Sequence, residues 1–147
     1  MHIKFSLAWA RPGQMVSKAF KSSGAYLLMH DYISRISRFF PCEASEYSPK
    51  MKAAVWVCER DKKSKTLSSE DLAKELGKVM NSGAQELQVV IGGADGFTAE
   101  RLEAMKPVLR WSFGPLTLPH ELAAVVAAEQ VYRALTILRN HPYHSGH

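Results

Sequence analysis

Two short apolar segments are the feature that most restricts the fold of this chain. They cover residues 53–58 and 87–91, and the second runs directly into Gly92 and Gly93. Segments of this length, apolar almost throughout, are typical of strands buried on both faces of a parallel sheet. Parallel neighbours need long crossover connections, which are usually helices. The two segments therefore predict an α/β fold.

The rest of the chain supplies the expected helices and further strands. Helical spacing and capping residues predict helices over about 17–39, with a break allowed at Ser22-Ser23-Gly24, from Ser68 or Ser69 to about 81, over 99–105 and over 119–139. Strands are expected at 3–9 and 108–112, with at most a short edge strand within 42–50 and a solvated loop over 59–65. Strand and helix alternate throughout, so we expect a mostly parallel sheet flanked by helices.

The composition is that of one ordinary domain. The chain has 147 residues, of which 46% are hydrophobic and 22% charged, so we expect a single domain over 1–147. No apolar segment approaches the roughly 20 residues of a membrane helix, and the N-terminal segment is typical of a strand rather than a signal peptide. The two cysteines, Cys42 and Cys58, form neither a disulfide framework nor a metal set and are expected to be packing residues. We therefore expect a cytoplasmic protein with no membrane partner and no metal.

An excess of basic residues favours an anionic partner. The formal net charge is +5, and nucleic acid is the commonest anionic partner for a protein of this size. Four cations lie on the polar side of the first predicted helix: Lys18, Lys21, Arg35 and Arg38. Two interpretations of them are open, an ordinary solvated face or a surface for RNA phosphates.

The last predicted helix is apolar on all sides in its first half, over 122–128. Such a helix is buried on most of its surface, and its four alanines would allow another helix to approach closely. Packing within the chain is one source of this burial, but a chain of this length offers few elements for it. We therefore expect a symmetric homodimer in which this helix or the first one packs against its mate. Glu129 and Arg133 have the spacing of a surface ion pair.

Two loops of the C-terminal third have the character of a ligand site. Gly92 and Gly93 follow a buried strand, although the sequence matches neither GxGxxG nor the GxxxxGKS/T phosphate loop. Residues 113–118 offer backbone N–H and C=O groups with apolar side chains, a lining that suits an adenine edge. A strand, a glycine turn and a helix start can direct backbone N–H groups toward a nucleotide-like ligand. The alternative is a plain tight turn and an ordinary crossover loop.

Residues 140–144, Asn-His-Pro-Tyr-His, follow the last predicted helix. The two histidines have no cysteine or carboxylate at metal-ligand spacing, which disfavours a metal site. An aromatic and imidazole-rich tail can stack on an unpaired RNA base, and a solvent-exposed tail is the alternative. No Ser/His/Asp or Cys/His pattern indicates covalent hydrolysis.

Segments of the C-terminal third resemble one family. They are residues 90–96 (VIGGADG), 111–112 with 116–120 (WS and LTLPH), 128–134 (AEQVYRA) and 140–144 (NHPYH), in that family's order and spacing. Residues 32–38 and 67–70 are similar to the end of its first helix and the start of a later one. The family is RlmH, whose members are SPOUT-class methyltransferases of large-subunit ribosomal RNA. The resemblance implies a C-terminal trefoil knot, a homodimer, S-adenosylmethionine bound in the knot, and methylation of a pseudouridine at ring nitrogen three.

The resemblance also implies which residues act. Cofactor contacts would come from Cys58, Gly92, Phe113, Gly114, Pro115, Leu116, Thr117 and Leu118. The candidates for the catalytic and RNA side of the site are Arg133, Tyr143, His144 and His120. Methyl transfer from a sulfonium needs an in-line approach and the loss of one proton from the attacking nitrogen. We therefore expect the knot to hold the cofactor and the tail to orient the base, with a histidine or water taking the proton.

The chain departs from the family pattern at three places. Where the family has a longer strand, a basic loop and a helix after Cys42, this chain has only about residues 45–52, so we expect a sheet that lacks one flanking helix. Residues 9–11 read Trp-Ala-Arg in place of Val-Gly-Lys, and 58–59 read Cys-Glu in place of Leu-Asp. Two alternatives stay open: a non-catalytic RNA-binding or ribosome-associated module of the same fold, and a SPOUT methyltransferase with another RNA target. Binding of S-adenosylmethionine separates the module from the enzyme.

Overall fold

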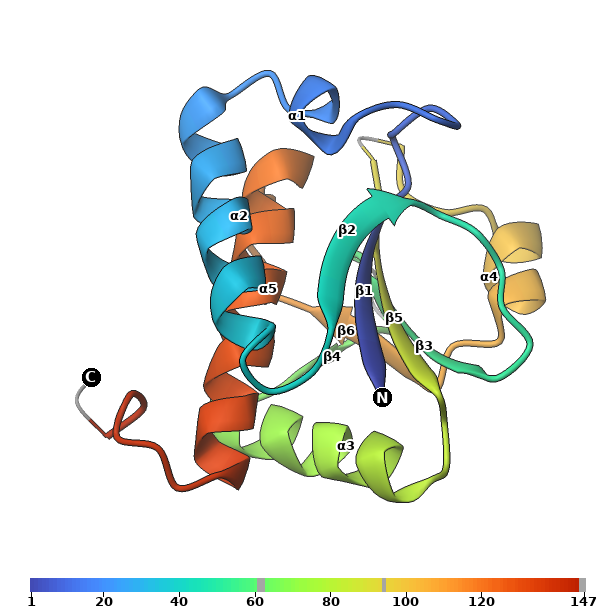
Figure 1. Ribbon diagram of the computed structural model, residues 1–147. Coiled ribbons are helices and arrows are strands. Elements are labelled where there is room, and N and C mark those ends of the chain that lie inside the picture. Colours follow the sequence, from blue (N-terminus) through green and yellow to red (C-terminus); the bar gives the residue numbers. More distant parts are fainter. Residues whose placement is uncertain (61–62, 94, 146–147) are drawn as a thin grey trace.

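Six strands form one sheet with helices packed against it (Figure 1). The computed structural model describes residues 1–60, 63–93 and 95–145. In chain order the elements are β1 (His2–Leu7), α1 (Val16–Ala19), α2 (Ser23–Ile36), β2 (Cys42–Glu46), β3 (Ala53–Cys58), β4 (Lys65–Thr66), α3 (Ser69–Asn81), β5 (Glu86–Ile91), α4 (Ala99–Met105), β6 (Leu109–Ser112) and α5 (His120–Leu138). None of the helices among the described residues combines the length and hydropathy of a membrane span.

The strand order is β2-β1-β5-β3-β6-β4, and every neighbouring pair is parallel. The predicted α/β fold with a mostly parallel sheet is thus confirmed. Cys58, the last residue of β3, pairs with Ile91 of β5 and with Trp111 of β6. Because the three strands run in one direction, the loops that follow them begin at the same edge of the sheet.

The two faces of the sheet are covered unequally. Helices α2 and α5 lie on one side of the sheet and the short α4 on the other (Figure 1). The main core is on the α5 side, where Phe5, Trp56 and Val89 are fully buried. Val57 and Val90 belong to a smaller cluster with α4. Since each buried side chain of this size stabilises the fold by about 1.5–3 kcal/mol, the α5 side contributes most of the hydrophobic stabilisation.

The segment over 47–52, between β2 and β3, contains no helix. The expectation that the sheet lacks a flanking helix here is confirmed. The Gln88 side-chain amide donates to the Ser48 carbonyl at 2.8 Å, which ties this segment to the middle of the sheet. Tyr47 packs against the smaller cluster beside α4. This short segment, held to the sheet by Gln88, therefore occupies the position at which the family pattern has a flanking helix.

The first predicted helix, over 17–39, is two helices. α1 ends at Ala19 and α2 begins at Ser23, close to the triplet that allows a break. Ser22 caps α2 by accepting a hydrogen bond from the Ala25 N–H at 3.1 Å. Glu121, in the first turn of α5, accepts from the N–H groups of Lys21 and Ser22 at 3.0 Å each. A carboxylate from a distant part of the chain therefore stabilises the break.

Two smaller predictions were wrong. Lys65, expected at the end of a solvated loop, forms β4 with Thr66, and the two pair with Trp111 and Ser112 of β6. Such a pairing is made by backbone groups and has no apolar pattern to reveal it. Pro119, expected in the first helical turn, precedes α5 as its N-cap.

α5 is buried within a single chain. Ala124, Ala127 and Ala128 have no exposed surface, and the helix packs against α2, α3, β1 and β5. The expectation that the chain offers too few elements to bury this helix is therefore wrong, because α2 and α3 both pack on it. The composition of α5 does not by itself require a second subunit.

We expect Glu121→Gln to lower the free energy of unfolding by about 1 kcal/mol, because a neutral amide is a weaker acceptor for the N–H groups of Lys21 and Ser22 just before α2. Burial alone would raise the pKa of Glu121, but the hydrogen bonds from Ser22 and Lys21 outweigh it and hold the pKa below its usual value. The stabilisation is thus present above the unfolded-state pKa of 4.5 and is lost as the pH falls through the lower folded-state value.

Urea unfolding of both proteins at about pH 7 and about pH 3 measures this effect, and the difference should shrink at the lower pH. Glu75→Gln, which removes a surface pair with Lys78, is the control and should cost less than about 0.5 kcal/mol. Equal losses in the two variants would contradict the capping role of Glu121.

Candidate functional site

A cavity of about 710 Å³ opens at the carboxyl edge of the sheet. It lies among the loops that follow β3, β5 and β6 and the first turn of α5. Seven of the predicted residues line it: Cys58, Gly92, Phe113, Leu116, Thr117, Leu118 and His120. Gly114 and Pro115 belong to the same loop but are not among its lining residues. The fold therefore brings three separate parts of the sequence to one cavity.

Local contacts hold the loop over 113–118 in shape. Gly114 has a φ of +100°, a conformation that favours glycine, and its N–H donates to the Ser112 hydroxyl at 3.3 Å. The Phe113 ring meets the Trp111 ring edge-on, with centroids 4.8 Å apart. Near the other end of the loop, Arg60 donates to the Thr117 hydroxyl at 2.6 Å. One wall of the cavity is thus anchored at both ends.

Gly92 marks a close approach between the backbone and an aromatic ring. A Cβ atom at this position would lie 2.9 Å from Cε2 of Phe97. Phe97 itself lines the cavity, and the Arg101 guanidinium lies 5.6 Å from its ring centroid. Sequence reasoning identified the glycine but missed Phe97, whose available signal was an aromatic residue immediately before the helix cap Thr98.

Three charged residues of the cavity wall were also missed: Glu59, Arg60 and Asp95. Glu59 directly follows β3, and its Oε1 accepts hydrogen bonds from Nε and Nη2 of Arg110, the former at 3.0 Å. The signal available for Glu59 was a charged residue at the end of a buried strand. The cavity is therefore walled by backbone, apolar groups and charges of both signs.

Neither cysteine has the character of a nucleophile. Burial, with a contribution from Glu43, raises the pKa of the Cys42 thiol to about 12. Burial, with a contribution from Glu59, also raises the pKa of Cys58. Both thiols are therefore protonated at neutral pH. Among the residues that the structure describes, no three His, Cys, Asp or Glu side chains are grouped to hold a metal ion.

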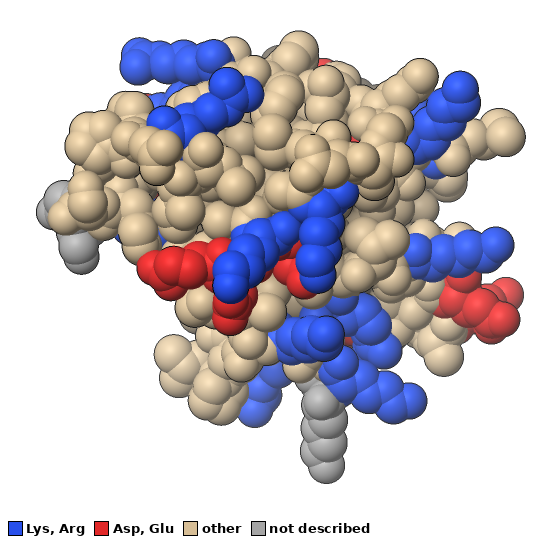
Figure 2. Space-filling model, turned by 90° about the horizontal axis from the view of Figure 1, so that it is seen from below, with Lys and Arg blue, Asp and Glu red and all other residues tan. Residues whose placement is uncertain are grey.

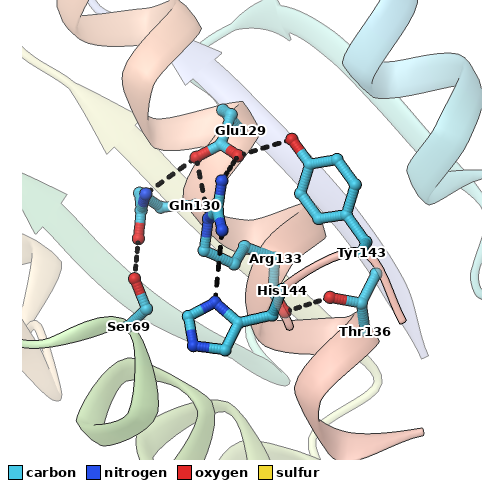
Figure 3. Close-up of polar contacts among 7 residues, drawn as sticks. All are labelled: Ser69, Glu129, Gln130, Arg133, Thr136, Tyr143 and His144. Carbon is cyan, nitrogen blue, oxygen red and sulfur yellow. Dashed lines mark hydrogen bonds and ion pairs between the residues drawn. The ribbon is translucent and has the colours of Figure 1, made fainter. Parts of the chain in front are cut away.

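A second group of polar side chains gathers near the other end of α5 (Figure 3). Glu129, Arg133, Tyr143 and His144 form what we call the tail cluster. Arg133 Nη2 and the Tyr143 hydroxyl both donate to Oε2 of Glu129, at 2.9 and 2.8 Å. The Arg133 guanidinium lies 4.9 Å from the Tyr143 ring centroid. The Glu129–Arg133 pair is confirmed, and Tyr143 is packed against α5 rather than exposed.

His144 bridges the tail cluster to α3. Its Nδ1 lies 3.2 Å from Nη1 of Arg133, and its Nε2 lies 2.6 Å from Oε1 of Glu70. Because a guanidinium only donates, Nδ1 must be the acceptor, and the ring proton is then on Nε2, facing Glu70. A hydrogen bond from its own backbone N–H, followed by that from His144, lowers the pKa of Glu70. Arg133 and Glu70 together fix the tautomer and the orientation of the imidazole.

Further contacts tie the tail cluster to α3. Ser69 Oγ donates to Oε1 of Gln130 at 2.7 Å, and Gln130 Nε2 donates to Oε1 of Glu129 at 2.7 Å (Figure 3). Sequence reasoning missed Glu70 and Gln130, because their role depends on the packing of α3 against α5.

The four predicted catalytic residues do not meet within one chain. His120 lines the cavity at the start of α5. Arg133 lies on the same helix at a distance of about 20 Å along the axis, at about 1.5 Å per residue. Figure 1 shows the tail leaving the opposite end of α5 from the helix start. The cavity and the tail cluster are therefore separate places in the isolated chain.

We expect Glu129→Gln to make Tyr143 ionise at a lower pH than it does in the unchanged protein. Burial, the hydrogen bond to Glu129 and the hydrogen bond to Tyr32 raise the pKa of Tyr143 above the usual 10.0. Removing the Glu129 charge removes part of that effect, so the pKa should fall toward the usual value.

NMR titration of ring-labelled tyrosine measures the change. At about pH 10.5 the Tyr143 signal should remain that of the protonated phenol in the unchanged protein and shift partly in Glu129→Gln. Glu75→Gln, which leaves the tail cluster intact, should not alter the signal. Identical titrations in all three proteins would show that Glu129 does not hold the hydroxyl.

Most of the chain matches a known protein family. A family model described as "Predicted SPOUT methyltransferase" matches residues 15–144. Proteins called ribosomal RNA large subunit methyltransferase H are similar in sequence. The one from Koribacter versatilis is 41% identical over 138 residues, covering 86% of this chain and 92% of that protein. Those from Methylocella silvestris and a Psychrobacter species are 49% and 50% identical over 84 and 92 residues, covering 57% and 63% of this chain and 51% and 54% of their own lengths.

A solved structure is also similar. It is a methyltransferase from Legionella pneumophila in complex with the bound cofactor SAM, at a TM-score of 0.44 and 15% sequence identity. The match covers 92% of this chain and 66% of that one.

Proposed function

Because this chain belongs to the SPOUT methyltransferase family and, within it, to the RlmH family, we propose that it methylates large-subunit ribosomal RNA with S-adenosylmethionine as donor. The finer proposal is that the methyl group goes to ring nitrogen three of a pseudouridine. One observation carries the proposed methyltransferase activity: the ends of β3, β5 and β6 bring Cys58, Gly92 and the 113–118 loop to a single cavity. This activity would be exercised in the cytoplasm, where ribosomal RNA is available.

The cavity suits the proposed cofactor. Its volume of about 710 Å³ lies within the usual range of a small-molecule site. The anchored 113–118 loop presents backbone groups for an adenine edge, and the glycine at 92 leaves room beside Phe97. When bound, S-adenosylmethionine supplies an electrophilic methyl group. The residues of this chain would hold the cofactor and orient it for in-line attack. We also propose that the chain around this site forms the trefoil knot that the family resemblance implies.

The tail cluster would orient the RNA base. Tyr143 offers an aromatic ring, His144 a fixed imidazole and Arg133 a cation, the groups with which proteins recognise unpaired bases. The proton from the ring nitrogen would pass to a histidine or to water. Because Arg133 lies about 20 Å along α5 from His120 within one chain, we propose that a partner subunit brings its own tail to the cavity. The proposed enzyme is therefore a homodimer.

Exposed apolar side chains support a dimer. Leu28 of α2 and Leu122 of α5 are 48% and 42% exposed. Both line a second hollow with Val125, and this hollow shares Pro119 and His120 with the cofactor cavity. A subunit packed on this apolar surface would lie beside the cavity. The homodimer thus finds its support in α2 and α5, although not in the burial of α5 itself.

The surface charge suits an RNA partner. Figure 2 shows many basic side chains beside fewer acidic ones on the face seen from below in Figure 1. The elements at this end carry exposed cations, including Lys74, Lys78 and Arg139. Arg35, one of the cations first considered for phosphate binding, instead pairs with Asp31 at 3.1 Å. Lys74 and Lys78 also have carboxylates nearby, Asp71 and Glu75, but exposed pairs of this kind are weak and leave both cations able to contact phosphates.

Calorimetric titration with S-adenosylmethionine tests the cofactor site. We expect the protein to bind it, and Gly92→Ala to weaken binding at least about tenfold, because the added methyl group displaces Phe97 from the cavity wall. Gly77→Ala is the matched control, since a Cβ there meets Leu138 at an ordinary 3.8 Å. Failure of the folded, unchanged protein to bind the cofactor would reject the enzyme.

Mass mapping of large-subunit RNA from a deletion strain, with variants added back, tests the tail. We expect Tyr143→Phe and His144→Ala to lower methylation by about 100-fold or more, and Ser145→Ala, next to them, to leave it unchanged. A mixture of Gly92→Ala with the Tyr143→Phe/His144→Ala chain should recover methylation at limiting cofactor, because one site of each mixed dimer is intact. Absence of recovery would contradict a site shared between subunits.

A second function is favoured by the missing helix over 47–52. A chain that has lost part of the family's surface could retain RNA binding as a non-catalytic, ribosome-associated module. The same RNA mapping separates the cases. Retention of the methylpseudouridine in the deletion strain would indicate another RNA target, and cofactor binding without any methylation would indicate the module.

A further inference from the structure

Glu59 is a carboxylate held in the wall of the cavity. Its side chain is only 7% exposed, and the residue lines the cavity beside Cys58 and Gly92. Its backbone N–H donates to the Trp111 carbonyl at 3.0 Å, so the residue continues the alignment of β3 with β6. The side chain therefore starts from a rigid position at the carboxyl edge of the sheet.

The two oxygens of Glu59 have different surroundings. Oε1 accepts from Nε and Nη2 of Arg110, which fixes the plane of the carboxylate. Oε2 has no hydrogen-bond partner among the described residues. Oε2 is not one of the fully buried unpaired atoms, so it is open to accept hydrogen bonds from water or from a bound ligand.

The position of Glu59 indicates which part of a ligand it meets. The Gly92 N–H donates to the Cys58 carbonyl at 3.4 Å, so the glycine turn after β5 and the start of the Glu59 segment touch. In dinucleotide-binding α/β folds an acidic side chain accepts a hydrogen bond from a ribose hydroxyl; this chain lacks the GxGxxG motif of those folds, but Glu59 offers the same chemical group at the same edge of the sheet. Adenine, by contrast, would be met by the backbone groups of the 113–118 loop. A carboxylate only accepts, and the two ribose hydroxyls are donors.

We propose that Glu59 binds the ribose hydroxyls of the nucleoside part of the cofactor and that Arg110 is the positioning residue for this carboxylate. The inference rests on the proposed function, because it names the residue that reads one part of that ligand. It assigns a ligand contact to one of the charged residues of the cavity wall.

Calorimetry with S-adenosylhomocysteine and its 2′-deoxy and 3′-deoxy analogues tests the proposal. In the unchanged protein, loss of a hydroxyl that Glu59 binds should weaken binding about tenfold or more. In Glu59→Gln, S-adenosylhomocysteine itself should bind about tenfold more weakly, and the analogues should bind nearly as well as it does. Glu59→Asp keeps the charge, but its shorter side chain holds the carboxylate further from the ligand. If Glu59→Gln does not fold, Glu59→Asp replaces it, and we expect the same changes in affinity.

The positioning role of Arg110 has its own readout. The hydroxyl penalty is the factor by which binding weakens when a ribose hydroxyl is removed from the ligand. Arg110→Met should reduce this penalty in the same assay, and Arg110→Lys should restore part of it. Glu75→Gln, remote on α3, should bind all three ligands as the unchanged protein does. If Glu59→Gln keeps the full hydroxyl penalty, the assignment is wrong even when overall affinity falls. If the unchanged protein binds none of the ligands, the proposed function fails and this inference fails with it.

Discussion

Parallel pairing of β3 with β5 and β6 is the constraint on which the site depends. The register that aligns Cys58 with Ile91 and with Trp111 makes three strands end together. The glycine turn, the Glu59 segment and the 113–118 loop then have to leave the sheet at the same edge. A slip of this register would move the loops apart and turn each buried side chain to the other face. The hydrophobic core and the cavity are therefore specified by the same set of backbone hydrogen bonds.

α5 organises the rest of the molecule because it contributes to both the cavity and the tail cluster. Its first turn borders the cavity with His120 and caps α2 with Glu121. Its later turns carry Glu129 and Arg133, which hold the tail. A rigid helix sets the separation between them, so a function that uses both ends needs a second subunit. This is a stronger reason for a dimer than the apolar composition of the helix, which α2 and α3 already bury.

Arginine and carboxylate pairs set the geometry at both places. Arg110 orients Glu59 in the cavity wall, and Arg133 holds Glu129 while it fixes the tautomer of His144. In each pair, the guanidinium neutralises a half-buried carboxylate and limits its rotation. The side chains that would contact a ligand are therefore held in place before the ligand binds.

The sequence by itself determined the fold class, most of the helix limits and the family. Buried strands, caps such as Ser68 and Thr98, and the glycine at 92 are local signals, and local backbone sterics and hydrogen bonding produce them. It also identified seven of the residues that line the cavity, because most of those residues lie in contiguous motifs. Only the tertiary structure decided the contacts of Glu59, Glu70 and Glu121, which join segments far apart in the chain. The predicted continuous helix already separates His120 from Arg133, but only the tertiary structure shows that the first lines the cavity and the second holds the tail, because those contacts come from other segments of the chain.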